Sequence, residues 1–248
     1  MSIIMNAIIG IIMSMTQSEQ DYFLMQVNDA VFPIGAYAHS YGLETYVARG
    51  IVHDTATARE WIDAYMRESF LYNDMMASRA AYRAAAQGDT ACAIDIEKAM
   101  RAMRTARETR EACYKLGQRL VKNVLSMMDD VPELFSAYVE AARPIGYSQP
   151  VIYGVICAAY GIGLERAMRF YAYAKLSSLV TTCVKLIPLS QRDGQIILRR
   201  ELATWESIVS EAAMASDDGD DMTFGFSTPG LDIRSMQHET LYSRLYMS

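Results

Sequence analysis

Apolar residues recur at the spacing of an α-helix along most of the chain. After Trp61 they return at Ile62, Tyr65, Met66 and Tyr72, which is the three- to four-residue interval of a helix face. Thr57-Ala-Arg-Glu60 reads as a capping box, so we expect a helix to start there. Further helices are predicted over residues 90–128, 133–142, 151–160, 164–186 and about 190–214. No alternating run of strand length is visible, so the pattern predicts an all-α, single-domain helical bundle.

The two ends of the chain depart from this pattern. The apolar run 3–15 is shorter than the ~20 residues of a membrane-spanning helix. No Lys or Arg precedes it and no A-x-A site follows, so residues 1–20 are predicted to be a poorly ordered or oligomer-buried leader, with a secretion signal as the weaker alternative. Residues 21–215 form the predicted helical domain, 216–230 an acidic linker, and 231–248 a helical C-terminal tail.

Composition narrows the class of protein. With 52% hydrophobic and 21% charged residues, the chain can bury a core. The net charge of −6 argues against nucleic-acid binding, which needs clustered Lys and Arg. The four cysteines are scattered without a CxxC motif, which favours buried free thiols and a reducing, cytoplasmic location.

The chain lacks the common motifs of nucleotide and metal chemistry. It contains no GxxxxGK[ST] phosphate loop, and Gly161-Ile-Gly163 lacks the third glycine of a dinucleotide fingerprint. The histidines, His39, His53 and His238, have no metal-ligand spacing, so we expect no cofactor, no metal cage and no tight nickel site. Sixteen tyrosines accompany many arginines, a pairing that interface centres favour.

A segment of unusual composition, VFPIGAYAHSYGLETYV, covers residues 31–47 and is called the signature segment below. Pro33 fixes φ and Gly35 relaxes a turn, after which a helix is expected from about Ala36. On such a helix Tyr37 and Tyr41 would share one face. Gly42 would permit the close approach of a neighbouring element, and the surface as a whole suits docking better than acid–base chemistry.

The signature segment resembles the N-terminal motif of the urease accessory protein F family. Three further stretches agree with that family: residues 153–195, the IPLSQ at 187–191, and the tail sequence MQHETLYSRLYMS. The resemblance runs from about Tyr22 to Ser248, and the tail points to the subgroup of gastric Helicobacter-like ureolytic bacteria. Members commonly carry a histidine where this chain has Gln149.

The resemblance implies a non-catalytic, all-α protein that acts in the insertion of nickel into urease. Members dimerise, bind urease accessory protein D/H, and recruit the GTPase accessory protein G, which carries nickel. The complex then engages apo-urease. No nucleic-acid or membrane partner is implied.

Two groups of candidate site residues follow. The expected partner-binding residues are Pro33, Gly35, Tyr37, His39, Tyr41, Gly42, Glu44, Arg244, Leu245 and Tyr246. We expect the tail to order only when D/H binds and then to bring Arg244 near the Tyr37 region. The expected dimer interface lies on the apolar helices 151–186, whose faces exceed what one core would absorb, and comprises Ile152, Ile156, Arg166, Met168, Arg169, Tyr171, Leu176 and Leu179.

Two alternatives to a scaffold stay open at this point. One is a protein that regulates the GTPase with an arginine finger, for which Arg166, Arg169 and Arg244 are the candidates. The other is a helical enzyme with a site built from Tyr37, His39 and Tyr41. The sequence does not choose between stimulated and delayed GTP hydrolysis.

Overall fold

The computed structural model describes residues 15–215 and 224–248, and every regular element in these two parts is a helix. This confirms the predicted all-α class. The elements are α2 (Gln17–Val27), η1 (Ala36–Ala38), α3 (Leu43–Ala48), α4 (Thr55–Ala64), η2 (Tyr65–Met75), α5 (Met76–Ala86), α6 (Thr90–Met103), α7 (Arg107–Met127), α8 (Glu133–Ala142), α9 (Gln149–Ala159), α10 (Leu164–Leu186), α11 (Gln191–Met214) and α12 (Pro229–His238).

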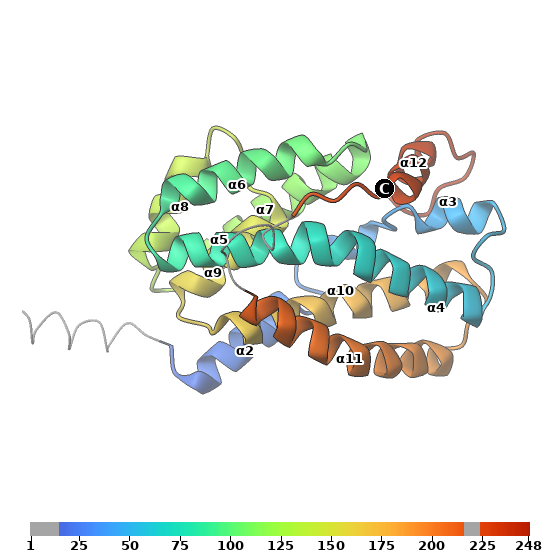
Figure 1. Cartoon of the computed structure of the whole chain (residues 1–248), viewed down its shortest axis with the longest axis horizontal. Helices are drawn as coiled ribbons and strands as arrows, with labels where there is room; N and C mark the ends of the chain where they lie inside the picture. The colour runs from blue at the N-terminus through green and yellow to red at the C-terminus, as the bar shows by residue number, and fades with distance from the viewer. Residues whose placement is uncertain (1–14, 216–223) are drawn as a thin grey trace, which may run out of the picture.

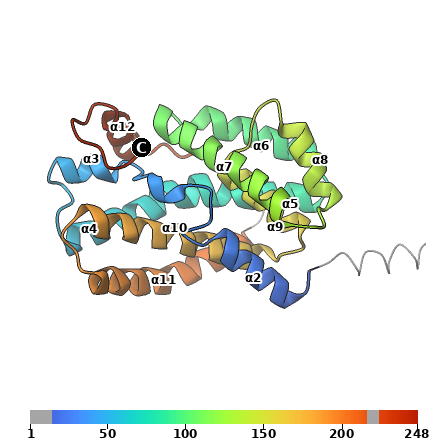
Figure 2. The same ribbon diagram turned by 180° about the vertical axis from the view of Figure 1, so that it is seen from behind.

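The helices pack around one hydrophobic core (Figures 1 and 2). α9 lies in the centre, against α5 on one side and α7 on another, and α10 pairs with α11. α4, η2 and α5 follow one another without a loop and form the longest rod of the molecule. α12 lies beside α3 at the end opposite α8, which brings the C-terminal tail next to the signature segment.

Two glycines allow helices to approach at backbone distance. A Cβ at Gly154 of α9 would collide with the Ser78 carbonyl of α5. A Cβ at Gly117 of α7 would collide with the Tyr147 carbonyl in the loop before α9. The centre of the bundle therefore depends on the absence of a side chain at these positions.

The structure corrects two helix boundaries. α4 starts at Thr55 with Asp54 as its N-cap, and the capping box pairs Asp54 with Thr57, so Thr57 is the third helical residue and not the cap. The predicted helix 90–128 is two helices, α6 and α7, separated at residues 104–106. At this break Arg104 forms an ion pair with buried Asp74, with 2.7 Å between Arg104 Nη2 and Asp74 Oδ1. A continuous helix pattern does not reveal this pair.

The two predicted end segments lie partly outside the described residues. Residues 1–14 of the predicted leader and residues 216–223 of the predicted acidic linker lie outside the described residues. α2 begins at Gln17, four residues before the predicted domain boundary at 21, and is capped by Thr16. None of the described helices is long and apolar enough to cross a membrane.

The apolar residues of the predicted dimer interface lie in the core of the single chain. Ile152, Ile156, Met168, Tyr171, Leu176 and Leu179 are each no more than 2% exposed. The premise that these faces exceed what one monomer can absorb is therefore wrong, because α5, α7 and α11 cover them. Of the same set, Arg166 and Arg169 reach the surface, where they pair with Asp21 and with Glu165 and Glu206.

Candidate functional site

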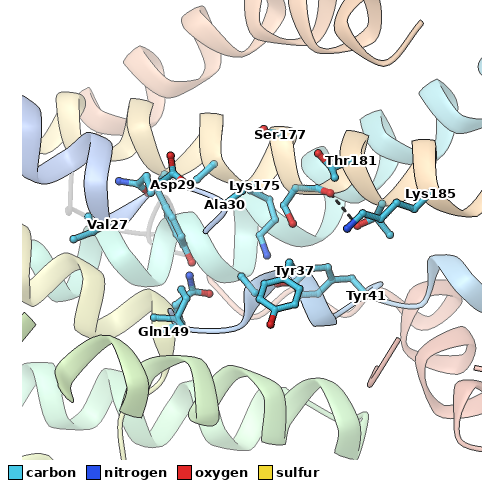
Figure 3. Close-up of a pocket in the computed structure, with 17 residues that line it drawn as sticks. Val27, Asp29, Ala30, Tyr37, Tyr41, Gln149, Lys175, Ser177, Thr181 and Lys185 are labelled. Atoms are coloured by element: carbon cyan, nitrogen blue, oxygen red, sulfur yellow. Dashed lines mark hydrogen bonds between the residues drawn. The ribbon is translucent and has the colours of Figure 1, made fainter. Parts of the chain in front are cut away.

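The signature segment forms an irregular loop between α2 and α3. Gly35 has a φ of 85°, Tyr41 of 54° and Gly42 of 84°, so the chain turns left-handed twice within eight residues. Between these turns there is a single short helical turn, η1, and the helix expected from Ala36 is not formed. Tyr37 and Tyr41 therefore do not share a helix face, although both line one cavity beside α10 (Figure 3).

Two side chains of α7 donate hydrogen bonds to backbone carbonyls of this loop. Arg119 Nη1 donates to the Ile34 carbonyl at 2.9 Å, and Asn123 Nδ2 donates to the Pro33 carbonyl at 3.2 Å. A Cβ at Gly35 would occupy the place of the Arg119 guanidinium. The Pro-Ile-Gly turn is thus fixed to the bundle, and Gly35 is required both for its φ and for space.

Glu44, at the start of α3, accepts three hydrogen bonds from the C-terminal tail. The backbone N–H groups of Leu245 and Tyr246 donate to its carboxylate at 2.6 and 3.1 Å, and His238 Nε2 lies 2.9 Å away. The Glu44 side chain is buried in this contact. A carboxylate of the signature segment is therefore the point to which the tail is attached.

His238 joins that point to α7. Its Nδ1 lies 2.7 Å from a carboxylate oxygen of Glu108, so the buried ring stands between two carboxylates. Only the imidazolium form can donate from both nitrogens. Arg244 lies 3.4 Å from the other oxygen of Glu108, and Gly42 leaves room for Ser235 of α12, whose Oγ a Cβ would meet at 2.9 Å. This confirms the close approach predicted at Gly42.

The last residues of the tail run along the loop before α3. The Met247 N–H donates to the Ala38 carbonyl at 2.8 Å, and the Ser40 N–H donates to the Ser248 carbonyl at 2.5 Å. The Ser248 hydroxyl lies 2.6 Å from His39 Nδ1. The signature segment and the tail are thus joined by backbone pairs as well as by the Glu44 contact.

His39 is neutral in this setting. Burial, and next the positive charges of Lys175, Lys115 and Arg119, lower its pKa from 6.5 to about 4. The unfolded chain therefore binds more protons than the folded chain between pH 4 and 6.5. The contribution to the free energy of unfolding is complete above about pH 6.5 and is lost as the pH falls through this window.

We expect wild-type protein to lose about 3 kcal/mol of unfolding free energy through His39 between pH 6.5 and 4. A His39→Asn variant, which keeps a hydrogen-bonding side chain but does not titrate, should show a flatter profile. Urea titrations at a series of pH values measure the difference. Identical slopes for the two proteins would contradict this assignment.

Apolar side chains remain exposed around the joined segments. Tyr37 is 62% and Leu245 69% exposed, and Tyr242 and Met247 lie in solvent as well. Tyr246 is buried, and Arg244 is partly exposed beside Glu108. The structure therefore brings the predicted partner-binding residues into one region, with Arg244 held at Glu108.

Tyr37, His39 and Tyr41, the candidates for a helical enzyme, have different surroundings. His39 Nδ1 is hydrogen-bonded to the Ser248 hydroxyl. The centroid of the His39 ring lies 6.4 Å from that of the Tyr41 ring, and the Tyr37 side chain is exposed to solvent. In residues 15–215 and 224–248, no group of three or more His, Cys, Asp or Glu side chains is placed to hold a metal ion. Burial raises the pKa of Cys157 and Cys183 to about 12, so these thiols stay protonated.

Three functional contacts were missed from the sequence. Glu108 and Arg119 belong to the arginine-rich helical stretch 90–128, and Ser235 belongs to the tail, for which only Arg244, Leu245 and Tyr246 were predicted to make contacts. Arg119 and Glu108 lie eleven residues apart, about three helical turns, which places them on one face of α7. That spacing was the one available signal.

Comparisons with known proteins agree with one another. A model of the UreF family matches residues 52–201. "Urease accessory protein UreF" of Arthrobacter sp. (strain FB24) is 34% identical over 228 residues, covering 91% of this chain and 96% of its own length. The protein of the same name from Haemophilus influenzae (strain ATCC 51907 / DSM 11121 / KW20 / Rd) is 36% identical over 230 residues, covering 91% and 94%.

A third relative with that name, from Actinobacillus pleuropneumoniae serotype 3 (strain JL03), is 35% identical over 227 residues, covering 91% of this chain and 97% of its own length. These relatives come from Arthrobacter, Haemophilus and Actinobacillus, so they do not support the narrower Helicobacter-like subgroup. A family match over more than half of the chain and relatives aligned over almost their whole length lead to the same assignment: the chain belongs to the UreF family of urease accessory proteins.

Proposed function

We propose that this protein is a non-catalytic scaffold in the insertion of nickel into urease. In this proposal it binds urease accessory protein D/H, recruits the GTPase accessory protein G, and presents the assembly to apo-urease in the cytoplasm. Nickel is cargo of the complex and not a resident cofactor of this chain. Membership in the UreF family supports the pathway, and the joined signature segment and tail support the scaffold role.

One observation carries the proposal: two segments about 200 residues apart in sequence form a single polar junction at Glu44. The exposed side chains of Tyr37 and Leu245 belong to the two segments joined there, which supports a shared binding surface. Aromatic and apolar residues around a fixed polar junction are typical of a protein-binding surface. No redox, nucleophilic or metal chemistry is needed to explain it.

The tail is attached by buried Tyr246 and by charged pairs, while several of its apolar side chains face solvent. Tyr242, Leu245 and Met247 remain exposed, and charged pairs make up much of the attachment. Ordering of such a segment is readily coupled to a partner that covers its apolar side. The tail is already docked through Glu44 in the single chain, so we propose that D/H binding stabilises this docked conformation, together with homodimerisation.

Deletion of residues 232–248 should abolish capture of D/H while the helical domain stays folded, because the deleted segment covers polar groups that water can solvate. A pull-down with tagged D/H, with circular dichroism as the folding control, measures both effects. Normal capture of D/H by the deleted protein would contradict the proposal.

Arg244→Ala should be milder, because its contact with Glu108 is long and partly solvated. We expect D/H capture to persist and recruitment of the GTPase to weaken. Arg107→Ala, which removes another exposed arginine bound to the tail through Glu239, is the matched control. GTP turnover by the partner, with and without this protein, separates a scaffold from the alternative of a GTPase regulator.

A further inference from the structure

A cavity of about 80 Å³ lies between α10 and the signature segment (Figure 3). Its lining includes Lys175, Ser178 and Thr181 of α10, Tyr41 of the signature segment, and Gln149 at the start of α9. The Lys175 side chain points from α10 toward Tyr37 and Tyr41. We call this hollow the Lys175 cavity.

The charge of Lys175 is buried without a carboxylate partner. The residue is 6% exposed, and no ion pair within 4.0 Å is found for it among the described residues. Its Nζ lies 3.8 Å from the centroid of the Tyr41 ring and 5.9 Å from those of Tyr65 and Phe70. Aromatic faces stabilise a cation, but they do not neutralise it.

Asp74 is a buried carboxylate that acts on Lys175; Arg104 engages its Oδ1, and its Oδ2 has no hydrogen-bond partner among the described residues. Asp74 pairs with Arg104 at 2.7 Å, so Lys175, Arg104 and Asp74 together carry one excess positive charge. Two rim residues of the cavity, Asp29 and Lys185, have opposite charges and cancel. The net positive charge of these groups attracts an anion, and burial strengthens that attraction.

The ammonium form is favoured at neutral pH. Burial lowers the pKa of Lys175, but Tyr41, Tyr65 and Asp74 outweigh it, so the pKa lies above its ordinary value. Backbone strain at the site is consistent with a built geometry, because Tyr41 is the non-glycine residue of the described chain with a left-handed φ. That conformation places its ring beneath Lys175.

Hydrogen-bond donors accompany the charge. Tyr171 contributes to the lining, and its buried hydroxyl has no hydrogen-bond partner among the described residues. Ser178 and Thr181 add hydroxyls and Gln149 adds an amide. The cavity, at about 80 Å³, is several times larger than the ~10–15 Å³ that one water needs, which leaves room for a small anion.

We propose that the Lys175 cavity binds a small monovalent oxyanion of the carboxylate class, of the size of acetate or bicarbonate. Lys175 supplies the charge, Tyr41 fixes the ammonium, and the hydroxyls and the Gln149 amide orient the oxygens. Inorganic phosphate, which carries more charge than the site compensates, binds less well. This inference does not depend on the proposed scaffold function.

The test is a titration of the isolated, full-length protein with sodium acetate, sodium bicarbonate and sodium phosphate, followed by ¹H–¹⁵N NMR at constant ionic strength against sodium chloride. We expect saturable shifts at the amides of Tyr41, Gln149 and Ser178 in the millimolar range. Lys175→Met should weaken binding by about tenfold or more, since it removes a charge-assisted contact. Phosphate should produce weaker shifts than acetate.

Lys175→Met should fold, because an apolar side chain of similar length replaces a buried, uncompensated charge. Lys98→Met on α6 removes one exposed lysine and is the matched control, with unchanged anion binding. The absence of saturable shifts in the wild type would show that no anion binds and would overturn the proposal. Equal shifts in the wild type and in Lys175→Met would identify adventitious binding only and would overturn it as well. Preference for phosphate would overturn the assigned ligand class.

Discussion

Glu44→Ala should release the C-terminal tail from the signature segment. The change leaves the His238 ring with one carboxylate in place of two, and it removes the acceptor of the Leu245 and Tyr246 N–H groups. Breaking a buried charged contact in this way costs roughly 3–5 kcal/mol. Because the tail can move into water, we expect this cost to appear as local opening and not as global unfolding.

Hydrogen exchange measures that opening. Amides of Leu245, Tyr246 and Met247 should exchange faster by on the order of a hundredfold or more, at tenfold for each 1.4 kcal/mol. Amides of α9 and α10 should keep their protection. Glu239→Gln, which removes an exposed carboxylate that pairs the same tail with Arg107, is the control and should leave exchange near Glu44 unchanged. Slow exchange of the tail amides in Glu44→Ala would contradict the assignment of Glu44 as the attachment point.

The all-α class and most helices could be predicted from the sequence because their signals are local. The helix 133–142, the helices on either side of Gly161-Ile-Gly163, and the helix that ends at Met214 match the predicted positions closely. Glycine, proline and a capping serine mark these boundaries. The break at residues 104–106 has no such mark, because it is stabilised by Asp74, thirty residues away in sequence. A local pattern cannot report a distant partner.

The residues of the candidate site likewise include some that the sequence reveals and some that it does not. Pro33, Gly35 and Gly42 stand out in sequence because special backbone conformations need special residues. Tyr41 does not, since its left-handed φ is imposed by its surroundings.

The sequence pattern did not identify the charged residues of the site, because the helices that contain them gave no signal for these positions. Glu108 and Arg119 lie in an arginine-rich helix, and Lys175 lies in an apolar one. Their roles depend on which helix faces which loop, so sequence periodicity does not identify them.

The position of the dimer interface was predicted from the apolar content of two helices, and that premise was wrong. Apolar content was weighed helix by helix, but α9 and α10 are covered by several neighbours at once. A central helix can be apolar on nearly every side without leaving any face for a second subunit. The buried residues of these helices therefore say little about association, and homodimerisation stays a prediction that rests on the family.

Gly154→Ala should be strongly destabilising, because α5 and α9 cross at this residue and the added methyl group would overlap the Ser78 carbonyl. A backbone carbonyl cannot rotate away as a side chain can, so the two helices must separate. Overpacking of a tight core costs 1–3 kcal/mol, and we expect roughly 3 kcal/mol here, which lowers the Tm by about 6–12 °C for a chain of this size.

Gly163→Ala is the matched control for Gly154→Ala. No atom lies within 4 Å of a Cβ built at Gly163, and its φ of −59° suits alanine. That variant should be close to neutral, since the restriction of the unfolded chain by alanine is offset by the lower preference for alanine at the N-cap of α10. Thermal unfolding followed by circular dichroism compares the two proteins directly. Equal Tm values would show that α5 and α9 can separate at little cost, and the central crossing would then not be the contact on which the bundle depends.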